Sequence, residues 1–412
     1  MRITVLSDHL RSLSGEGGGV DRCQWRVAQE YARRGHEVDF VTFEALPFYH
    51  AETIDRVRMH LASPVGPIAA KISIFRASGR NWRYLMRSTL LPARPSKRMR
   101  SLPSLIRYIK DRQPDLMISA GTFENLTAIL AVAGARAENT RLLVSERNPL
   151  AVRIGNRTNR PSWRWRYLAE ALRHFYTEAT RVIAISNALA RDIHAVLDID
   201  PEHIATVYNP IVTSNDIGRT RPIPEHPWLQ QNDIPVILAV GRLQRQKDFS
   251  TLLTAFGELL KQQDARLVFL GDGPERENLL GQARAQGIHE KVAFLGYMTN
   301  VQDFMAHANV LVVSSRYEGG PSVIIEALAA GCQVVSTDCP GSPREMLRDG
   351  ELGALVPIES PAALAHATLH TINNPVPREK LLSGAVDFTI ERAADGYLRA
   401  AGFQGDRENK PD

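Results

Sequence analysis

Cysteine is scarce in this chain of 412 residues. The three cysteines are Cys23, Cys332 and Cys339. Their spacing matches neither a disulfide framework nor a zinc site, so we interpret them as packing residues. A reducing compartment is therefore expected.

Long apolar runs are also missing. No stretch approaches the roughly eighteen apolar residues that cross a bilayer. The N-terminus, MRITVLSD, has no extended apolar segment and no small-residue cleavage site, so we predict no signal peptide. With 44% hydrophobic and 23% charged residues, the composition is typical of a soluble globular protein. The length leaves room for two or three domains, and the expected location is the cytoplasm.

Acidic residues are nearly absent from two basic clusters. Twelve Lys or Arg lie between Lys71 and Arg112 against one acid, Asp111. From Arg153 to Arg166 there are five arginines, two tryptophans and no acid. Such clusters suit an anionic membrane surface, nucleic acid or a phosphate-bearing substrate, or form a solvated basic face. No nucleic-acid-binding pattern is present, so we expect no nucleic-acid partner and a peripheral position on the inner face of the cytoplasmic membrane.

Predicted strands and helices alternate through most of the chain, which indicates an α/β fold with doubly wound parallel sheets. Residues 63 to 101 are expected to be irregular, ahead of a helix from Leu102 to Arg112. The predicted strands are Ile3–Leu6, Glu37–Phe43, Leu116–Ser119, Leu142–Ser145, Val182–Ile185, Ala205–Tyr208, Val236–Val240, Leu267–Leu270, Val292–Leu295, Val310–Val313 and Gln333–Ser336.

A polar stretch punctuated by prolines interrupts this alternation and predicts two domains joined by a linker. We expect the C-terminal helix to pack back toward the first domain, followed by a disordered tail. The predicted boundaries are 1–212 for the first domain, 213–234 for the linker, 235–384 for the second domain, 385–402 for the C-terminal helix and 403–412 for the tail.

Two carboxylates flank a predicted helix start in the second domain. Glu318 follows a strand, Pro321 is expected at the first helical position, and Glu326 lies within the helix. A helix opening after a strand directs its free N–H groups into the crevice above the sheet, where an anion could bind. By themselves, the two acids fit a binding site and an ordinary strand–turn–helix equally well.

Two cations are expected at the same end of this sheet. Arg242 and Lys247 follow the first strand of the second domain, and such a pair suits a diphosphate. A glycine-rich loop after the first strand of the chain also invites a dinucleotide-binding interpretation. That fit is poor, because Val20 stands where the third glycine of the pattern belongs.

Four stretches of the second half follow one another at characteristic spacing: AVGRLQRQKDFSTLLTAF, LVFLGDGPERENL, VAFLGY and SRYEGGPSVIIEALAAGCQVVSTDCPGSPREML. In their order and spacing they resemble the nucleotide-sugar-binding domain of glycosyltransferase family 4. GGGVDR, LLVSERN, IAISNALARDI and VYNPI extend it more loosely over the first half. The resemblance implies the GT-B fold, in which two Rossmann-like domains face a central cleft, and a retaining enzyme that needs no metal or other cofactor. The SERNP and YNPI forms look closest to enzymes of bacterial lipid-linked or exported polysaccharides.

The resemblance also implies residue roles. Arg242 and Lys247 would bind the donor diphosphate and stabilise its developing charge, and Glu318 would lie by the donor sugar. Glu326 would accept hydrogen bonds from the ribose. Further donor-binding candidates are Gly320, Pro321 and Ser322 at the helix start, Gly296 and Tyr297 near the base, and Gly18 and Gly19 from the first domain.

The acceptor side departs from the family pattern. Many relatives place a histidine or an acid in the loop after the strand matching Leu116–Ser119, whereas this chain has AGTFE there. Candidates for the acceptor side are Glu124, Arg147 and Asn148. Gly320 also replaces an aromatic residue common in the family.

Several functions are consistent with these residues. The leading hypothesis is transfer of a hexose or N-acetylhexosamine from a UDP-sugar to a lipid-linked or polysaccharide acceptor. The alternatives are a GDP-mannose-dependent mannosyltransferase, a GT-B nucleotide-sugar epimerase and an NAD-dependent oxidoreductase. A pseudoenzyme is disfavoured because Arg242, Lys247, Glu318 and Glu326 are all present.

Overall fold

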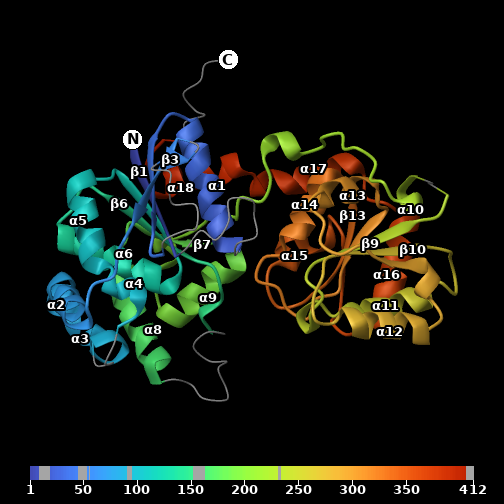
Figure 1. Cartoon of the computed structure of the whole chain (residues 1–412), viewed down its shortest axis with the longest axis horizontal. Helices are drawn as coiled ribbons and strands as arrows, with labels where there is room; N and C mark the ends of the chain where they lie inside the picture. The colour runs from blue at the N-terminus through green and yellow to red at the C-terminus, as the bar shows by residue number, and fades with distance from the viewer. Residues whose placement is uncertain are drawn as a thin grey trace. The chain divides into compact units, whose positions relative to one another are not determined.

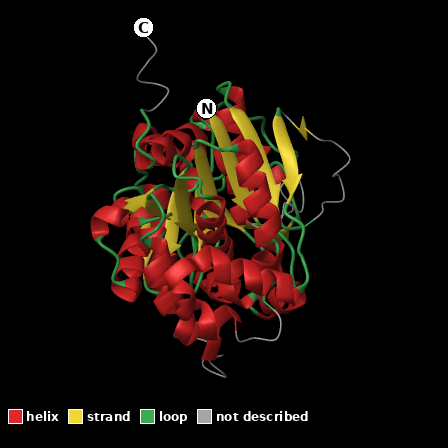
Figure 2. Cartoon of the chain, turned by 90° about the vertical axis from the view of Figure 1, so that its left-hand side faces the viewer, coloured by secondary structure: helices red, strands yellow, loops and turns green. Residues whose placement is uncertain are grey.

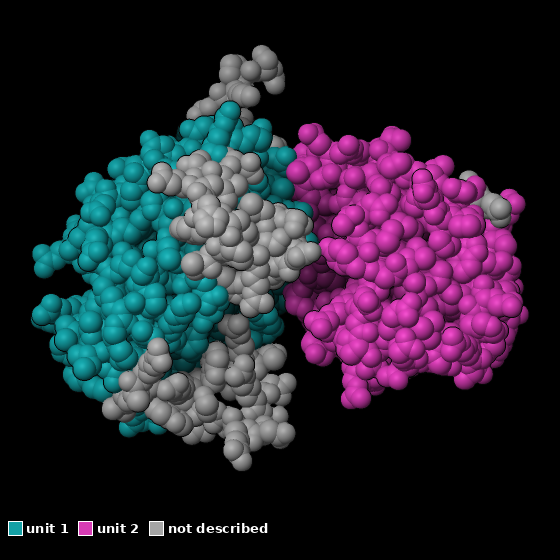
Figure 3. Space-filling model, in the orientation of Figure 1, with its two compact units in different colours: residues 1–210, 390–412 teal, residues 211–389 magenta. Residues whose placement is uncertain are grey.

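The chain divides into two compact units. The computed structural model describes residues 1–8, 19–44, 53–54, 56–90, 95–151, 163–230 and 233–404. Unit 1 comprises residues 1–210 and 390–412, and unit 2 comprises 211–389 (Figure 3). The stretch expected as a linker, 213–234, belongs to unit 2 in this division. Most of the tail expected to be disordered, from residue 405 onward, lies outside the described residues.

Within the described residues, unit 1 contains an eight-stranded sheet of order β3-β4-β2-β1-β5-β6-β7-β8 (Figure 2). All neighbouring strands are parallel except the short antiparallel pair β3 and β4. The strands are β1 (Arg2–Ser7), β2 (Glu37–Thr42), β3 (Thr53–Ile54), β4 (Val57–Leu61), β5 (Leu116–Ala120), β6 (Arg141–Glu146), β7 (Arg181–Ala184) and β8 (Ile204–Thr206).

Helices cover both faces of this sheet because its strands are apolar on both sides. In β5, Leu116 and Ile118 pack in the cluster that contains α1 and α18, whereas Met117 packs in the cluster on the opposite face. Successive side chains of a strand point to opposite faces, which explains this division. The helices are α1 (Gly19–Arg33), α2 (Pro67–Ser78), α3 (Trp82–Leu85), α4 (Lys97–Arg100), α5 (Leu102–Arg112), α6 (Thr122–Ala135), α8 (Trp163–Tyr176), α9 (Asn187–Leu197) and α18 (Ile390–Ala400).

Unit 2 contains a six-stranded parallel sheet of order β11-β10-β9-β12-β13-β14, again counted within the described residues. Chain order reverses between β9 and β12, which pair directly through Ile237 with Val310 and Leu238 with Leu311. The strands are β9 (Val236–Val240), β10 (Arg266–Leu270), β11 (Val292–Phe294), β12 (Val310–Val313), β13 (Gln333–Thr337) and β14 (Ala354–Val356).

The helices of unit 2 form a layer on each side of its sheet. In Figure 1, α13, α14 and α17 lie on one side of the strands, and α11, α12 and α16 lie on the other. The bounds are α10 (Pro227–Gln230), α11 (Phe249–Leu259), α12 (Arg276–Ala285), α13 (Val301–His307), α14 (Ser322–Ala330), α15 (Pro343–Met346), α16 (Pro361–Asn373) and α17 (Arg378–Ala385). The prediction of an α/β fold with doubly wound parallel sheets is confirmed.

The C-terminal helix α18 completes the core of unit 1. Tyr397 is fully buried against α1, and the Tyr31 hydroxyl donates to the Ala394 carbonyl oxygen at 2.8 Å. Arg34 bridges the two segments, because its guanidinium lies 2.5 Å from Asp395 and 2.7 Å from Glu30. All three side chains of this ion cluster are less than 10% exposed.

The prediction that residues 63–101 are irregular was wrong. They contain α2, a 3₁₀ turn (Gly79–Asn81), α3, a π-helical turn (Met86–Leu90) and α4. Helix α2 has no amphipathic pattern, because apolar residues lie on both of its sides. No described helix is long and apolar enough to span a membrane.

Candidate active site

The centre of the candidate site lies at the carboxyl ends of β9 and β12, where chain order reverses. In open parallel sheets, ligands bind at this reversal point, outside the carboxyl ends of the strands. The loop after β9 runs through Gly241 to a 3₁₀ turn that ends at Lys247. The loop after β12 runs through Ser315 to Glu318. Backbone hydrogen bonds join the two loops, since the Arg316 amide donates to the Gln246 carbonyl oxygen at 2.9 Å.

Lys247 and Glu318 form an ion pair in this position. The Lys247 Nζ lies 2.5 Å from Glu318 Oε1, and the Ser315 hydroxyl donates to the same oxygen at 2.6 Å. The Glu318 side chain is 7% exposed and that of Lys247 is 16% exposed. Charge-assisted hydrogen bonds of this kind are short and strong. The carboxylate is therefore held in one place by two donors.

Glycines make this arrangement sterically feasible. At Gly341, with a φ of 133°, a Cβ would lie 1.6 Å from the Glu318 carbonyl oxygen. At Gly241, with a φ of 146°, a Cβ would lie 3.1 Å from Lys247 Cε. Both backbone conformations are ones that L side chains rarely adopt. These two glycines leave room for the Glu318 backbone and the Lys247 stem.

Helix α14 begins next to Glu318. Pro321 is its N-cap, with φ of −71° and ψ of 93°, and Ser322 is the first helical residue. The helix therefore begins one residue later than predicted. A proline in the cap position can accept the first helical hydrogen bond but has no N–H to donate, and here the Ile324 amide donates to its carbonyl oxygen at 3.1 Å. Glu326 is half-buried within the helix, and Gly320 is half-buried ahead of it.

The ion pair makes no hydrogen bond with three other predicted donor-binding residues, Arg242, Gly296 and Tyr297. Arg242 is exposed, and no hydrogen bond or ion pair joins it to another described residue. The Gly296 carbonyl oxygen accepts from the Gly271 amide at 2.6 Å, and Tyr297 is 69% exposed. None of these contacts tests whether the three residues bind the donor, so their donor-binding roles stay predictions.

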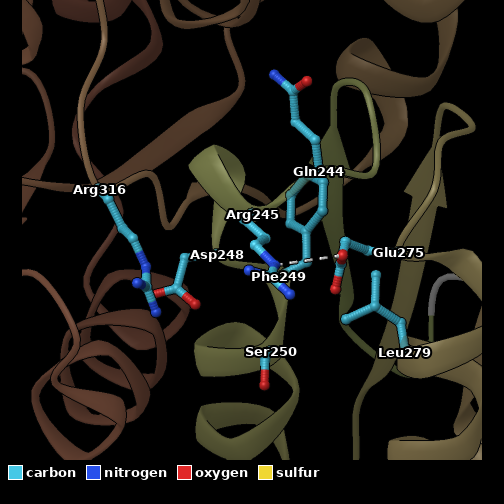
Figure 4. Close-up of a pocket in the computed structure, with 8 residues that line it drawn as sticks. All are labelled: Gln244, Arg245, Asp248, Phe249, Ser250, Glu275, Leu279 and Arg316. Atoms are coloured by element: carbon cyan, nitrogen blue, oxygen red, sulfur yellow. Dashed lines mark ion pairs between the residues drawn. The ribbon is translucent and has the colours of Figure 1, made fainter. Parts of the chain in front are cut away.

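A separate pocket of about 330 Å³ lies on unit 2. Its lining contains none of the residues predicted to bind the donor (Figure 4). Two of its cations are already paired, with Arg316 3.3 Å from Asp248 and Arg245 3.8 Å from Glu275. Each of these cations is thus shared with a carboxylate, as Lys247 is with Glu318.

Unit 1 places a second charged cluster at its own reversal point, between β1 and β5. Arg98 forms ion pairs with Asp8, which follows β1, and with Glu124, in the first turn of α6. Burial raises the pKa of the Glu124 carboxyl to about 7, because desolvation outweighs the opposing effect of Arg98. Glu124 can therefore exchange a proton near neutral pH.

The other candidates from unit 1 have different surroundings. Arg147 is buried, and its guanidinium donates to Asn209 at 2.5 Å and to the Tyr397 hydroxyl at 3.0 Å. Asn148 is exposed. Gly19 begins α1, whereas Gly18 lies outside the described residues.

Four residues of these two clusters were not singled out from the sequence. Ser315 and Gly341 position Glu318, and Asp8 and Arg98 surround Glu124. Asp8 had a signal that could have been used, since it directly follows a buried strand. Arg98 had none, because one basic residue among twelve is not distinguished by sequence.

Each of the two doubly wound sheets has charged residues at its reversal point, which is where such folds bind nucleotides and other ligands. The family model described as "Glycosyl transferases group 1" matches residues 225–385, and that described as "Glycosyltransferase Family 4" matches residues 17–215. The chain belongs to glycosyltransferase family 4.

Curated relatives match over part of their length. One is the N-acetylgalactosamine-N,N'-diacetylbacillosaminyl-diphospho-undecaprenol 4-alpha-N-acetylgalactosaminyltransferase of Campylobacter jejuni, 32% identical over 45% of this chain and 48% of the relative. Another is the lipopolysaccharide core biosynthesis glycosyltransferase LpsE of Rhizobium meliloti, 34% identical over 40% of this chain and 49% of the relative. The chain thus spans about half the length of these two relatives.

Solved structures share the fold over nearly the whole chain. An Anabaena protein solved in complex with UDP has a TM-score of 0.71 at 19% identity, covering 98% of this chain and 100% of the other. A lipopolysaccharide outer core galactosyltransferase in its apo form has a TM-score of 0.68 at 19% identity, covering 97% and 99%. The predicted GT-B fold class is confirmed.

Proposed function

We propose that this protein is a retaining glycosyltransferase that moves a hexose or N-acetylhexosamine from a UDP-sugar to a lipid-linked or polysaccharide acceptor. The reaction is a front-face substitution without a metal ion, in which the leaving diphosphate helps to deprotonate the incoming hydroxyl. The observation that carries the proposal is the Lys247–Glu318 pair beside the start of α14. A cation, a carboxylate and free helix N–H groups together suit a sugar diphosphate.

The relatives support the choice of donor and acceptor. The Campylobacter jejuni enzyme is named for transfer to a glycan on diphospho-undecaprenol, and the Anabaena structure holds UDP. By analogy, we infer a UDP-sugar donor and an acceptor carried on a lipid diphosphate. Such an acceptor would bring the enzyme to the inner face of the cytoplasmic membrane.

We assign distinct tasks to Lys247 and Glu318. As the glycosidic bond breaks, negative charge develops on the diphosphate, and Lys247 with Arg242 stabilises that charge. The diphosphate then competes with Glu318 for the Lys247 ammonium. Glu318 keeps the Ser315 hydroxyl as a donor to Oε1 at 2.6 Å, so it is not left unpaired, and its other carboxylate oxygen can accept from the sugar hydroxyls. Glu326 accepts hydrogen bonds from the ribose.

A screen of nucleotide-sugars for slow donor hydrolysis tests the proposal without knowledge of the acceptor. We expect Lys247→Ala and Glu318→Ala to lower kcat/KM by about 10²–10³-fold, the cost of losing a group that stabilises transition-state charge. Arg245→Ala is the matched control, because Arg245 lies in the same turn but its side chain is 92% exposed. If both site variants stay within about threefold of the wild type, the site assignment is wrong.

Calorimetric titration identifies the nucleotide. We expect tighter binding of UDP than of GDP, and reduced affinity for both in Lys247→Ala, because the lysine contacts the diphosphate common to both. Tighter GDP binding would replace the UDP-sugar with GDP-mannose as the donor. Conversion of a donor to its epimer, without transfer, would replace the transferase proposal altogether.

A further inference from the structure

Helix α2 of unit 1 exposes a stripe of large apolar side chains. Ile68 is 77% exposed, Ile72 49% and Phe75 52%. Residues spaced i, i+4 and i+7 lie on one face of a helix, so the three form a continuous stripe. Figure 1 shows α2 at the outer edge of unit 1. Isolated exposed apolar residues are common, but three on one helix face mark an interaction surface.

The fold of unit 1 does not need this stripe. The opposite side of α2 carries Ala70, Ile74 and Ser78, which are all buried, and Ile74 belongs to the unit 1 core. Packing against α6 and the neighbouring helices α4 and α5 therefore uses one side of α2 only. The apolar residues on the other side contribute little to the folded chain and require another explanation.

Cations surround the stripe. By helical geometry, Lys71 and Arg76 lie on its two sides. Arg80, Arg83 and Arg87 continue the row through the following turn and helix, and all three are exposed. No Asp or Glu occurs from residue 67 to 90.

Aromatic rings extend the apolar stripe into this cationic row. The Trp82 ring lies 5.5 Å from that of Phe75, and the Arg87 guanidinium lies 4.6 Å above the Tyr167 ring. Two acids approach from elsewhere: Glu178, which accepts from Asn81 at 2.9 Å, and Glu170, which lines a neighbouring hollow. Five cations against these two acids leave the surface positive.

We propose that α2 and the turn after it dock unit 1 on an anionic lipid bilayer, with Ile68, Ile72 and Phe75 inserted among the lipids. An apolar centre flanked by Lys and Arg is the pattern of an interfacial helix, because long cationic side chains reach the headgroups while their stems cover apolar surface. Charge complementarity favours a bilayer rich in anionic lipid over a neutral one. This inference rests on the proposed function, because a lipid-linked acceptor would require the enzyme to work at a membrane surface.

Flotation of the full-length chain with vesicles tests this surface. We expect binding to vesicles of phosphatidylcholine with about 30% phosphatidylglycerol, and weaker binding to pure phosphatidylcholine. The triple variant Ile68→Ser, Ile72→Ser, Phe75→Ser should lower the partition coefficient at least about tenfold, because the inserted apolar area is lost. Arg83→Glu with Arg87→Glu should have a similar effect at low salt, and about 0.5 M sodium chloride should weaken wild-type binding.

The controls lie on unit 2. Ile223→Ser removes an isoleucine that is 57% exposed, and Lys261→Glu with Arg284→Glu reverses two exposed charges. These variants should float like the wild type. Equal flotation of the triple variant and the wild type, or of pure phosphatidylcholine and anionic vesicles, refutes the proposal. Sedimentation that shows a wild-type dimer split by the triple variant, with no flotation, assigns the surface to a second copy instead.

Acceptor-free donor hydrolysis separates this proposal from the proposed function. The triple variant should hydrolyse the donor at the wild-type rate, which also shows that it is folded. A loss of hydrolysis in that variant contradicts a purely docking role. If the wild-type chain hydrolyses no nucleotide-sugar yet floats through α2, the proposed function fails while the docking surface stands.

Discussion

Replacement of Gly341 by alanine tests how strictly Glu318 must be positioned. Gly341 is not among the residues predicted to bind substrate, but a Cβ added there would lie 1.6 Å from the Glu318 carbonyl oxygen. Real Cβ atoms keep at least 3.0 Å from such an atom, so one of the two segments must shift by about 1.4 Å. The φ of 133° adds about 1–3 kcal/mol of backbone strain for alanine.

A shift of this size should disrupt the ion pair without removing either partner. The contacts of Glu318 Oε1 with Lys247 and Ser315 are 2.5 and 2.6 Å long, and neither survives a displacement above 1 Å. Misplacement by about 1 Å can cost about 10²-fold in rate, so we expect a comparable fall in the kcat of donor hydrolysis. Thermal unfolding, measured in parallel, should show a lower Tm.

The control for this variant is Gly281→Ala in α12. Gly281 is exposed, and a Cβ there meets nothing within 4 Å. Alanine favours a helix by about 1 kcal/mol over glycine, so this variant should be active and slightly more stable. A folded Gly341→Ala variant with wild-type kcat would refute the positioning of Glu318. If Gly341→Ala does not fold, Ser315→Ala gives the second test, because it removes one of the two donors to Glu318 and leaves the backbone unchanged.

Three further predictions concern unit 1. Because the pKa of Glu124 is raised to about 7, the pH profile of acceptor transfer should show an ionisation near pH 7 that is absent in Glu124→Gln. The pH profile of acceptor-free hydrolysis should be the same in both proteins. Identical transfer profiles would exclude Glu124 as the ionising group. The same raised pKa means that the contribution of Glu124 to the free energy of unfolding falls as the pH rises from about 4.5 to about 7, a slope that Glu124→Gln should lack in denaturation at several pH values. Arg34→Ala leaves Asp395 and Glu30 buried without this cation and should cost about 3–5 kcal/mol in chemical denaturation. Arg33→Ala, whose side chain is 67% exposed, should cost less than about 1 kcal/mol; equal costs would contradict the role of burial.

Sequence patterns predicted the sheets because buried parallel strands are continuous apolar runs separated by turn residues. The same alternation places the loops that follow β9 and β12 at one edge of a sheet, although Lys247 and Glu318 are 71 residues apart. The order and spacing of the motifs indicated glycosyltransferase family 4, and the matches to the two family models confirmed it. The donor and acceptor were not predictable in detail, since no spacing rule specifies a sugar.

Features that depend on tertiary packing could not be predicted. The Asp8–Arg98–Glu124 cluster joins three distant segments, and one of its members lies in a stretch that was expected to be irregular. The exposed apolar stripe of α2 could not be predicted from the sequence for a related reason. A helix that is apolar on its buried and its exposed side has no amphipathic periodicity, so exposure alone distinguishes the two sides.

The return of α18 to unit 1 affects the order in which the protein can mature during translation. Domains usually fold as they emerge from the ribosome, N-terminal first. Here unit 1 stays incomplete until α18 is synthesised, whereas unit 2 is one uninterrupted segment and emerges whole before that helix. Meanwhile Tyr31 and the rest of the α1 surface that packs against α18 lack their cover. A nascent chain stalled before residue 390 would therefore present an aggregation-prone apolar face, and unit 1 reaches its native state after unit 2 can.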